Sequence, residues 1–175
     1  MYELSGGQIF IDGNDISTLN VECLRSGMYI ISQDAFLFVG TVRMNLDPRD
    51  SSTDHEIWKA IEQCDARIFV LKLGGLTGQI SDQGHNLSAG EKQLICLIRA
   101  LLHRVRVLCL DEATSSIDDN TEFSLHSTIK KAFRNSTILL IAHKISSVLN
   151  CDKVIVIENG RVGEINSPEK LIQGN

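Results

Sequence analysis

Proline, aromatic residues and long hydrophobic runs are all scarce in this sequence. The 175 residues include 2 prolines and 5% aromatic residues, and no low-complexity tract suggests a disordered linker. The longest apolar run, STILLIAH at residues 136–143, is far shorter than the roughly 18 apolar residues of a membrane-spanning helix. The first residues, MYELSGG, lack the basic start and apolar stretch of a signal peptide. We therefore expect no membrane span here, which leaves open whether the chain docks on a membrane protein.

A basic excess and paired cysteines are also missing. The net charge is -5, which disfavours a nucleic-acid partner because phosphate binding usually shows as an excess of Lys and Arg. The 5 cysteines include no Cys-x-x-Cys pair, so their spacing argues against a zinc site, and a reducing cytosol fits best. With 43% hydrophobic residues, the chain is long enough for one domain with a sizeable core.

Strand-like and helix-like segments alternate along the chain. Buried or half-buried strands are expected at residues 9–12 (before a Gly-Asn-Asp turn), 28–31, 105–110 and 136–143. Helices are expected at 53–64, from Ser88 onward and at 119–135, and the glycine-rich segment 73–86 reads as a loop. Residues 153–166 predict a hairpin with Asn159-Gly160 in a type I′ turn. This order predicts a largely parallel α/β sheet with antiparallel hairpins at its two ends.

Two similar five-residue segments occur in different surroundings. LSGGQ at Leu4–Gln8 leads into a short alternating segment that Gly13 interrupts, so no useful helix fits there. LSAGE at Leu87–Glu91 leads into a long apolar stripe, and its Ser-x-x-Glu spacing predicts a capping box at a helix N-terminus. Such a helix end offers free N–H groups and a positive dipole to an anion. We expect LSAGE to be functional and LSGGQ to be a coincidence in a loop-to-strand turn.

The segment VLCLDE places Asp111 and Glu112 at the end of a buried strand. Ligands of open α/β sheets bind at that edge, where an acidic side chain can hold magnesium and a neighbouring one can deprotonate an attacking water. A strand end with two solvated acids explains the same letters equally well when they are taken alone.

Several motifs together resemble the nucleotide-binding domain of an ABC transporter. LSAGEKQ, LDEATSSID and LLIAHK are similar, in order and spacing, to the signature motif, the Walker B strand with its D-loop, and the switch histidine. IISQD resembles the Q-loop, and LFVGTVRMNLDP with IWKAIEQC resembles the second nucleotide-binding domain of the C subfamily, the multidrug-resistance-associated exporters. The resemblance covers essentially all of the chain. It implies a P-loop NTPase-like fold, with a parallel sheet core, flanking helices and a helical signature subdomain.

The resemblance divides the chain into a Q-loop region at 28–48, a helical signature region at 50–104, a region from Walker B to the switch histidine at 105–145, and a hairpin at 153–167. It also implies functional roles. The implied catalytic residues are Glu112 as general base, His143 at the γ-phosphate and Gln33 at the attacking water. The implied magnesium ligands are Asp111 and Gln33. The implied contacts to a partner's ATP or to the dimer interface are Ser88, Ala89, Gly90, Glu91 and Asp118.

Each of these residues has an ordinary explanation when it is taken alone. His143 follows an apolar strand and could be a core histidine, Gln33 could be an ordinary loop residue, and Ser88 and Asp118 could simply cap helices. Glu91 also departs from the family, which usually has Gln there, and a carboxylate would repel a phosphate unless it turned back onto Ser88. The set of residues, rather than any one of them, carries the resemblance.

A phosphate loop of the form G-x-x-x-x-G-K-[ST] does not occur in these residues, because no glycine is followed by lysine. In the family this loop precedes the segment that MYELSGGQIFIDG matches, so we expect the N-terminal P-loop part of the fold to be missing. We therefore expect the chain alone to bind Mg²⁺ and ATP weakly or not at all, and not to turn ATP over. Smaller departures are Ser32 and Ala35, which stand where the family usually has prolines.

The function implied by the resemblance is ATP hydrolysis coupled to membrane export of organic anions or conjugates. It implies a second nucleotide-binding domain as a head-to-tail partner, transmembrane domains, and a position at the cytoplasmic face of a membrane. The alternative is a non-catalytic dimerisation or regulatory module that supplies its signature motif in trans. A DNA-repair ATPase is a third possibility, against which GTVRMNLDP and the lack of coiled-coil heptads both count.

Overall fold

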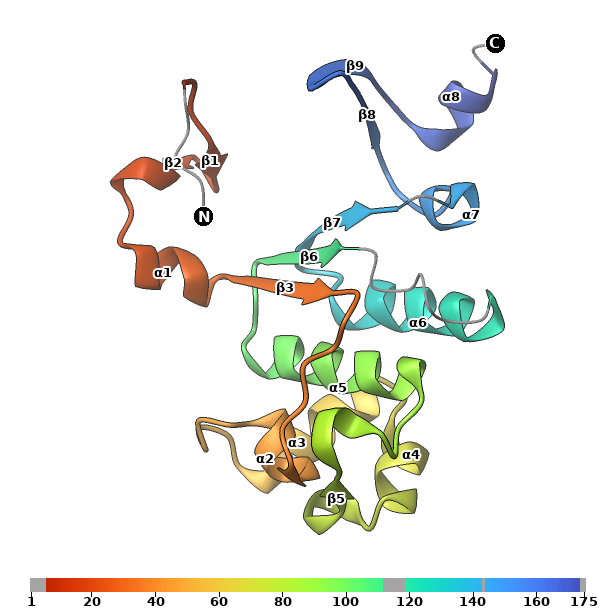
Figure 1. Cartoon of the computed structure of the whole chain (residues 1–175). Coiled ribbons are helices and arrows are strands. Elements are labelled where there is room, and N and C mark those ends of the chain that lie inside the picture. Colours follow the sequence, from red (N-terminus) through yellow and green to blue (C-terminus); the bar gives the residue numbers. More distant parts are fainter. Residues whose placement is uncertain (1–5, 112–118, 143, 174–175) are drawn as a thin grey trace. The chain divides into compact units, whose positions relative to one another are not determined.

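The computed structural model of the chain describes residues 6–111, 119–142 and 144–173 (Figure 1). The chain divides into two compact units, Met1–Leu139 and Leu140–Asn175. No helix in the described ranges has the length and apolar character needed to cross a membrane.

A small hairpin begins the described chain. Strands β1 (Phe10–Ile11) and β2 (Asn14–Asp15) pair antiparallel, and they are followed by a 3-10 turn at Ile16–Thr18 and by helix α1 (Val21–Ser26). The tight turn lies at Asp12-Gly13, whose φ angles are 49° and 77°. The predicted Gly-Asn-Asp turn starts one residue after the observed one. Asp-Gly suits a turn with two positive φ angles. No helix occurs at residues 6–8, the described part of LSGGQ.

A three-stranded sheet has the order β3-β6-β7. Strands β3 (Met28–Ser32) and β6 (Val107–Asp111) run parallel, with Ser32 opposite Asp111, which confirms the predicted parallel core. Strand β6 lies in the middle, and its Leu108 is fully buried. Strand β7 (Thr137–Ile141) was expected to be buried, but alternate side chains are exposed. This expectation was wrong because β7 is the outer strand of the three, and burial depends on neighbours as well as on apolar composition.

Two long helices lie along the sheet (Figure 1). Helix α5 (Ala89–Leu102) contacts β3 and α6 (Asp119–Ala132), which ends three residues before its expected end at 135. Helix α3 (Asp54–Gln63) packs against α5 and also contacts α6. The side chains of Ile57, Ile61, Ile95 and Ile98 in α3 and α5 are 0% exposed. The core is therefore centred on α5, the helix that begins with the LSAGE segment.

Shorter elements complete a helical layer around α5. Strands β4 (Gly40–Thr41) and β5 (Gln79–Ile80) pair antiparallel, and helices α2 (Val42–Leu46) and α4 (Arg67–Lys72) lie between them in sequence. The segment 73–86 contains 3-10 turns at Gly75–Thr77 and Asp82–Gly84 together with β5. Glycine is required at position 78, because a Cβ there would lie 2.0 Å from the carbonyl oxygen of Leu73.

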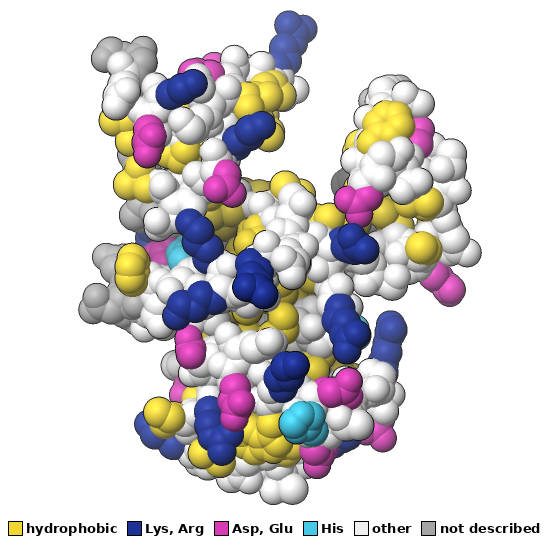
Figure 2. All heavy atoms as spheres, turned by 180° about the vertical axis from the view of Figure 1, so that it is seen from behind, with side chains coloured by type: hydrophobic (Ala, Val, Ile, Leu, Met, Phe, Trp, Pro, Cys, Tyr) yellow, Lys and Arg dark blue, Asp and Glu magenta, His cyan; other side chains and the backbone are white. Residues whose placement is uncertain are grey.

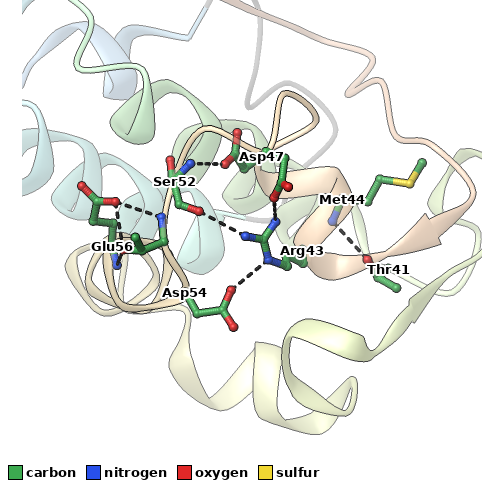
Figure 3. A network of polar contacts seen from close by, with 9 residues as sticks. Thr41, Arg43, Met44, Asp47, Ser52, Asp54 and Glu56 are labelled. Atoms are coloured by element: carbon green, nitrogen blue, oxygen red, sulfur yellow. Dashed lines mark hydrogen bonds and ion pairs between the residues drawn. The ribbon is translucent and has the colours of Figure 1, made fainter.

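A polar network fixes the start of α3 (Figure 3). The guanidinium of Arg43 donates to the Asp54 carboxylate at 2.8 Å and to the backbone carbonyl of Ser52 at 3.1 Å. Thr53 and Glu56 form the reciprocal capping box that begins α3. Arg43 thereby ties α2 to the first turn of α3.

The second unit contains helix α7 (Ile145–Val148), the hairpin of β8 (Val154–Glu158) and β9 (Arg161–Asn166), and helix α8 (Pro168–Gln173). Asn159 and Gly160 connect the strands with φ angles of 50° and 74°. These values confirm the predicted type I′ turn.

Candidate functional site

The two predicted magnesium ligands, Gln33 and Asp111, lie at the C-terminal ends of two parallel strands. Asp111 is the last residue of β6, and Gln33 directly follows Ser32, which pairs with Asp111 across the two parallel strands. Both residues are exposed. Because parallel strands end at the same edge, and ligands of α/β sheets bind outside that edge, the register brings Gln33 and Asp111 to a suitable place for a ligand.

The donor atoms of Gln33 and Asp111 suit magnesium. Amide and carboxylate oxygens are hard ligands, and Mg²⁺ in proteins usually takes one or two carboxylates while water and phosphate complete its octahedral shell. No group of three or more His, Cys, Asp or Glu residues that could hold a metal occurs within the part of the chain that the structure describes.

The LSAGE segment forms the start of α5 with a complete capping box. The Ser88 hydroxyl oxygen accepts a hydrogen bond from the Glu91 backbone N–H at 3.3 Å. The Glu91 carboxylate in turn accepts from the Ser88 backbone N–H at 2.8 Å and from the Ser88 hydroxyl at 2.9 Å. The predicted box is confirmed, and the Glu91 carboxylate is turned back onto Ser88.

Ala89 and Gly90 form the first turn of α5. Ala89 is exposed, whereas Gly90 is buried. A Cβ at Gly90 would lie 2.8 Å from Cγ2 of Thr121 in α6. Glycine at this position therefore allows the close approach of α6, a packing reason that the sequence did not reveal.

Gln93 connects the start of α5 to the end of β3. Its side-chain amide donates to the backbone carbonyl of Ser32 at 3.2 Å and to that of Gln33 at 3.1 Å. Gln93 is 3% exposed and is the last residue of the LSAGEKQ segment, but that motif does not reveal which groups its side chain contacts. Sequence reasoning missed this residue because its partners lie 60 and 61 positions away.

Arg99 holds the segment that follows Gln33 at a second place. Its guanidinium donates to the backbone carbonyl of Phe36 at 2.6 Å, and to the backbone carbonyl and side-chain oxygen of Asn45. The guanidinium carbon also lies 5.7 Å from the ring centre of Phe38, within reach of a cation–π interaction. Arg99 is buried, so these groups replace the water that a buried cation loses.

Three predicted residues lie outside the described ranges. They are the proposed general base Glu112, the D-loop residue Asp118 and the switch histidine His143. The structure therefore brings together Gln33, Asp111 and the capped start of α5, and the roles of the other three rest on the sequence motifs.

Comparisons with known proteins identify the family of the chain. The family model described as ABC transporter matches residues 1–115. The chain is 44% identical over 98% of its length to ATP-binding cassette sub-family C member 10 of Mus musculus, and 45% identical over 98% to sub-family C member 2 of Homo sapiens, but it spans 11% of each relative. It is also 42% identical over its full length to Metal resistance protein YCF1 of Saccharomyces cerevisiae, of which it spans 12%.

A solved structure shows the same fold. The chain matches a bacterial Atm1-family ABC exporter with ATP bound, with a TM-score of 0.88 and 31% identity over 99% of this chain and 31% of that one. This confirms the expected ABC ATPase fold with its parallel sheet core. The chain therefore belongs to the ABC transporter family, as a nucleotide-binding cassette domain whose relatives are members of the C subfamily.

Proposed function

We propose that this cassette powers a C-subfamily exporter, in which ATP hydrolysis drives organic anions or conjugates across a membrane. One observation carries the proposal: Gln33 and Asp111 share a sheet edge, and Gln93 joins that edge to the capped start of α5. Phosphoryl transfer needs positioned groups and charge stabilisation more than covalent help from the protein. This edge supplies such groups.

Four residues would share the work of hydrolysis at the nucleotide that this cassette itself binds. Gln33 would orient the attacking water and Asp111 would help hold magnesium, which when bound neutralises phosphate charge. Glu112 would accept a proton from the water, and His143 would contact the γ-phosphate; both roles follow from the family motifs. A carboxylate can accept a proton and an imidazole can hydrogen-bond a phosphate oxygen, so these side chains suit the proposed roles.

The start of α5 would act on an ATP molecule held by another cassette in a head-to-tail pair. Ser88 caps the helix, and Ala89 and Gly90 begin it, where backbone N–H groups and the helix dipole favour an anion. Asp118 would lie at the same interface. The Glu91 carboxylate already accepts two hydrogen bonds from Ser88, which reduces its repulsion of an approaching phosphate. A role limited to supplying this segment in trans, without hydrolysis, is the alternative.

Membrane attachment would use the segment that follows β3. Phe36, Val39 and Met44 are exposed apolar side chains there, at 69%, 62% and 46% exposure. Clustered exposed apolar side chains commonly mark interaction sites. We propose that this segment faces the transmembrane domains at the cytoplasmic side.

On the face seen in Figure 2, Lys and Arg side chains are spread among acidic ones, without the continuous basic patch of a nucleic-acid interface.

The 175 residues contain no Gly-Lys pair, so they lack the backbone nest and lysine that bind the β- and γ-phosphates in P-loop proteins. We propose that the chain by itself binds Mg²⁺ and ATP weakly and hydrolyses none.

Nucleotide-dependent association tests this function. The chain is mixed with a complete C-subfamily cassette whose general base is changed to glutamine, so that bound ATP persists, and the complex is measured by sedimentation with and without MgATP. We expect association only with MgATP, and its loss in Ser88→Arg, whose side chain would block the first turn of α5. Association that ignores either MgATP or this substitution would contradict the proposal.

A further inference from the structure

We propose that Gln93 is a positioning residue for Gln33, and that it transmits engagement of the α5 start to the sheet edge. The inference rests on the function proposed above, because it assumes that both places serve a nucleotide. It adds a residue that touches neither phosphate nor magnesium. Its work would be to hold the backbone that carries Gln33.

The hydrogen bonds of Gln93 are matched to that task. One side-chain amide has two N–H donors, and both are used, on the consecutive carbonyls of Ser32 and Gln33. The anchor is buried while Gln33 is exposed. The backbone at Gln33 is therefore fixed from inside the protein, and its side chain remains available to a ligand.

The orientation of the Gln93 amide follows from its partners. Only the NH₂ group can face two carbonyl oxygens, so the amide oxygen must point the other way. That oxygen is buried and has no hydrogen-bond partner within the described ranges. An unsatisfied buried acceptor opposes folding, and a Met or Leu side chain would fill the same space without it. Met or Leu would, however, leave the carbonyls of Ser32 and Gln33 without these donors, so what glutamine adds at this position is the hold on the Ser32–Gln33 backbone.

A second anchor makes α5 and this segment move together. Arg99 binds the carbonyl of Phe36 and both oxygens of Asn45. The chain from Ser32 to Phe36 is thus attached to α5 at both ends. Because Ser88 caps the same helix, a shift of α5 on anion binding would move the backbone of Gln33 with it.

Hydrogen exchange of the full chain tests the anchor. Gln93→Met keeps a similar shape but removes the donors. We expect amides 33–36 to exchange about tenfold faster, as loss of two modest hydrogen bonds predicts, together with a lower melting temperature. Gln93→His keeps one N–H at a similar reach and should restore part of the protection. Gln63→Met, an exposed site at the end of α3, is the matched control.

The coupling is tested in the mixture with the complete cassette and MgATP. Wild-type chain should gain protection at 33–36 on association, whereas Gln93→Met should associate through Ser88 without that gain. If Gln93 had a purely structural role, Gln93→Met would not lose the protection at 33–36 while keeping association. Equal exchange in wild type and Gln93→Met, free and in the complex, overturns the inference. Failure of the wild-type chain to associate overturns the proposed function, while the comparison of the free chains still decides whether Gln93 anchors Gln33.

Discussion

The carboxylate of Glu91 lies against Ser88, accepting hydrogen bonds from its backbone N–H at 2.8 Å and from its hydroxyl at 2.9 Å. The Ser88 hydroxyl proton is therefore already used within the first turn of α5. A phosphate approaching this turn meets a negative charge and a serine whose donor is occupied.

Replacing Glu91 by Gln should strengthen association with an ATP-loaded partner cassette. The amide oxygen still accepts from the Ser88 N–H, but the negative charge that opposes the phosphate is gone. We expect the dissociation constant to fall about threefold to tenfold, the size of a single charge effect at a helix end. Sedimentation with MgATP measures it. Glu22→Gln in the first turn of α1 is the control and should change nothing; an unchanged affinity for both variants would contradict the prediction.

Replacing Gly90 by Ala should destabilise the chain, although alanine normally favours a helix by roughly 1 kcal/mol. The new methyl group would lie 2.8 Å from Cγ2 of Thr121. Such overpacking costs about 1–3 kcal/mol of the free energy of unfolding. Urea denaturation measures the loss.

A double variant tests the cause of that loss. Thr121→Ser removes the Cγ2 methyl and keeps the hydroxyl, so it should rescue Gly90→Ala. Strict additivity of the two substitutions would show that the contact with Thr121 is not the cause.

Asp47 should make the stability of the chain depend on pH in the acidic range. Burial raises the pKa of this carboxyl, but hydrogen bonds from Ser52 and Ser51 outweigh it, and the pKa lies below its usual value. A lowered pKa means that the carboxylate stabilises the fold above pH ~4, where the unfolded carboxyl is ionised, and that this stabilisation disappears as pH falls through the folded pKa.

The matching variant is Asp47→Asn. It should lower the free energy of unfolding at pH 7 by about 1–3 kcal/mol, because buried hydrogen bonds to a charged group are lost. The difference from wild type should shrink below pH 4. Urea titrations at pH 7 and pH 3 measure both values, and a constant difference between them would exclude Asp47 as the titrating group.

The cysteines should differ sharply in reactivity. Burial raises the pKa of the Cys64 thiol to about 12, and Cys64 is 0% exposed, whereas Cys23 is exposed. The thiolate is the reactive form, so brief treatment with N-ethylmaleimide at pH 8 should label Cys23 and leave Cys64 unmodified. Peptide mass spectrometry identifies the labelled sites. In urea both should react, and equal labelling of the folded chain would contradict the burial of Cys64.

Local patterns in the sequence predicted the parts of the site that depend on near neighbours. The capping box at Ser88 follows from its Ser-x-x-Glu spacing, and it is present. The parallel pairing of the strands ending at Ser32 and Asp111 follows from buried strands that alternate with helices. Each of these features is set within one element or by the order of elements.

Features that depend on distant packing could not be predicted. Gln93 belongs to the LSAGEKQ segment, but its contacts with the end of β3 could not be predicted because its partners are 60 and 61 residues away. Gly90 is required by Thr121 on another helix, and the exposure of Leu139 on β7 depends on which strands surround it. Composition fixes whether a strand can be buried, whereas its neighbours decide whether it is.

The most direct test of the proposed function is hydrolysis in trans. A complete, catalytically intact C-subfamily cassette is mixed with this chain, and phosphate release is followed as the chain concentration rises. Addition of the chain should accelerate hydrolysis, the Ser88→Arg chain should not, and the chain alone should release no phosphate. No acceleration, or equal acceleration by Ser88→Arg, would contradict the proposal that this cassette acts on ATP held by its partner, and Glu112-dependent hydrolysis by the chain alone would contradict the proposal that it hydrolyses no ATP by itself.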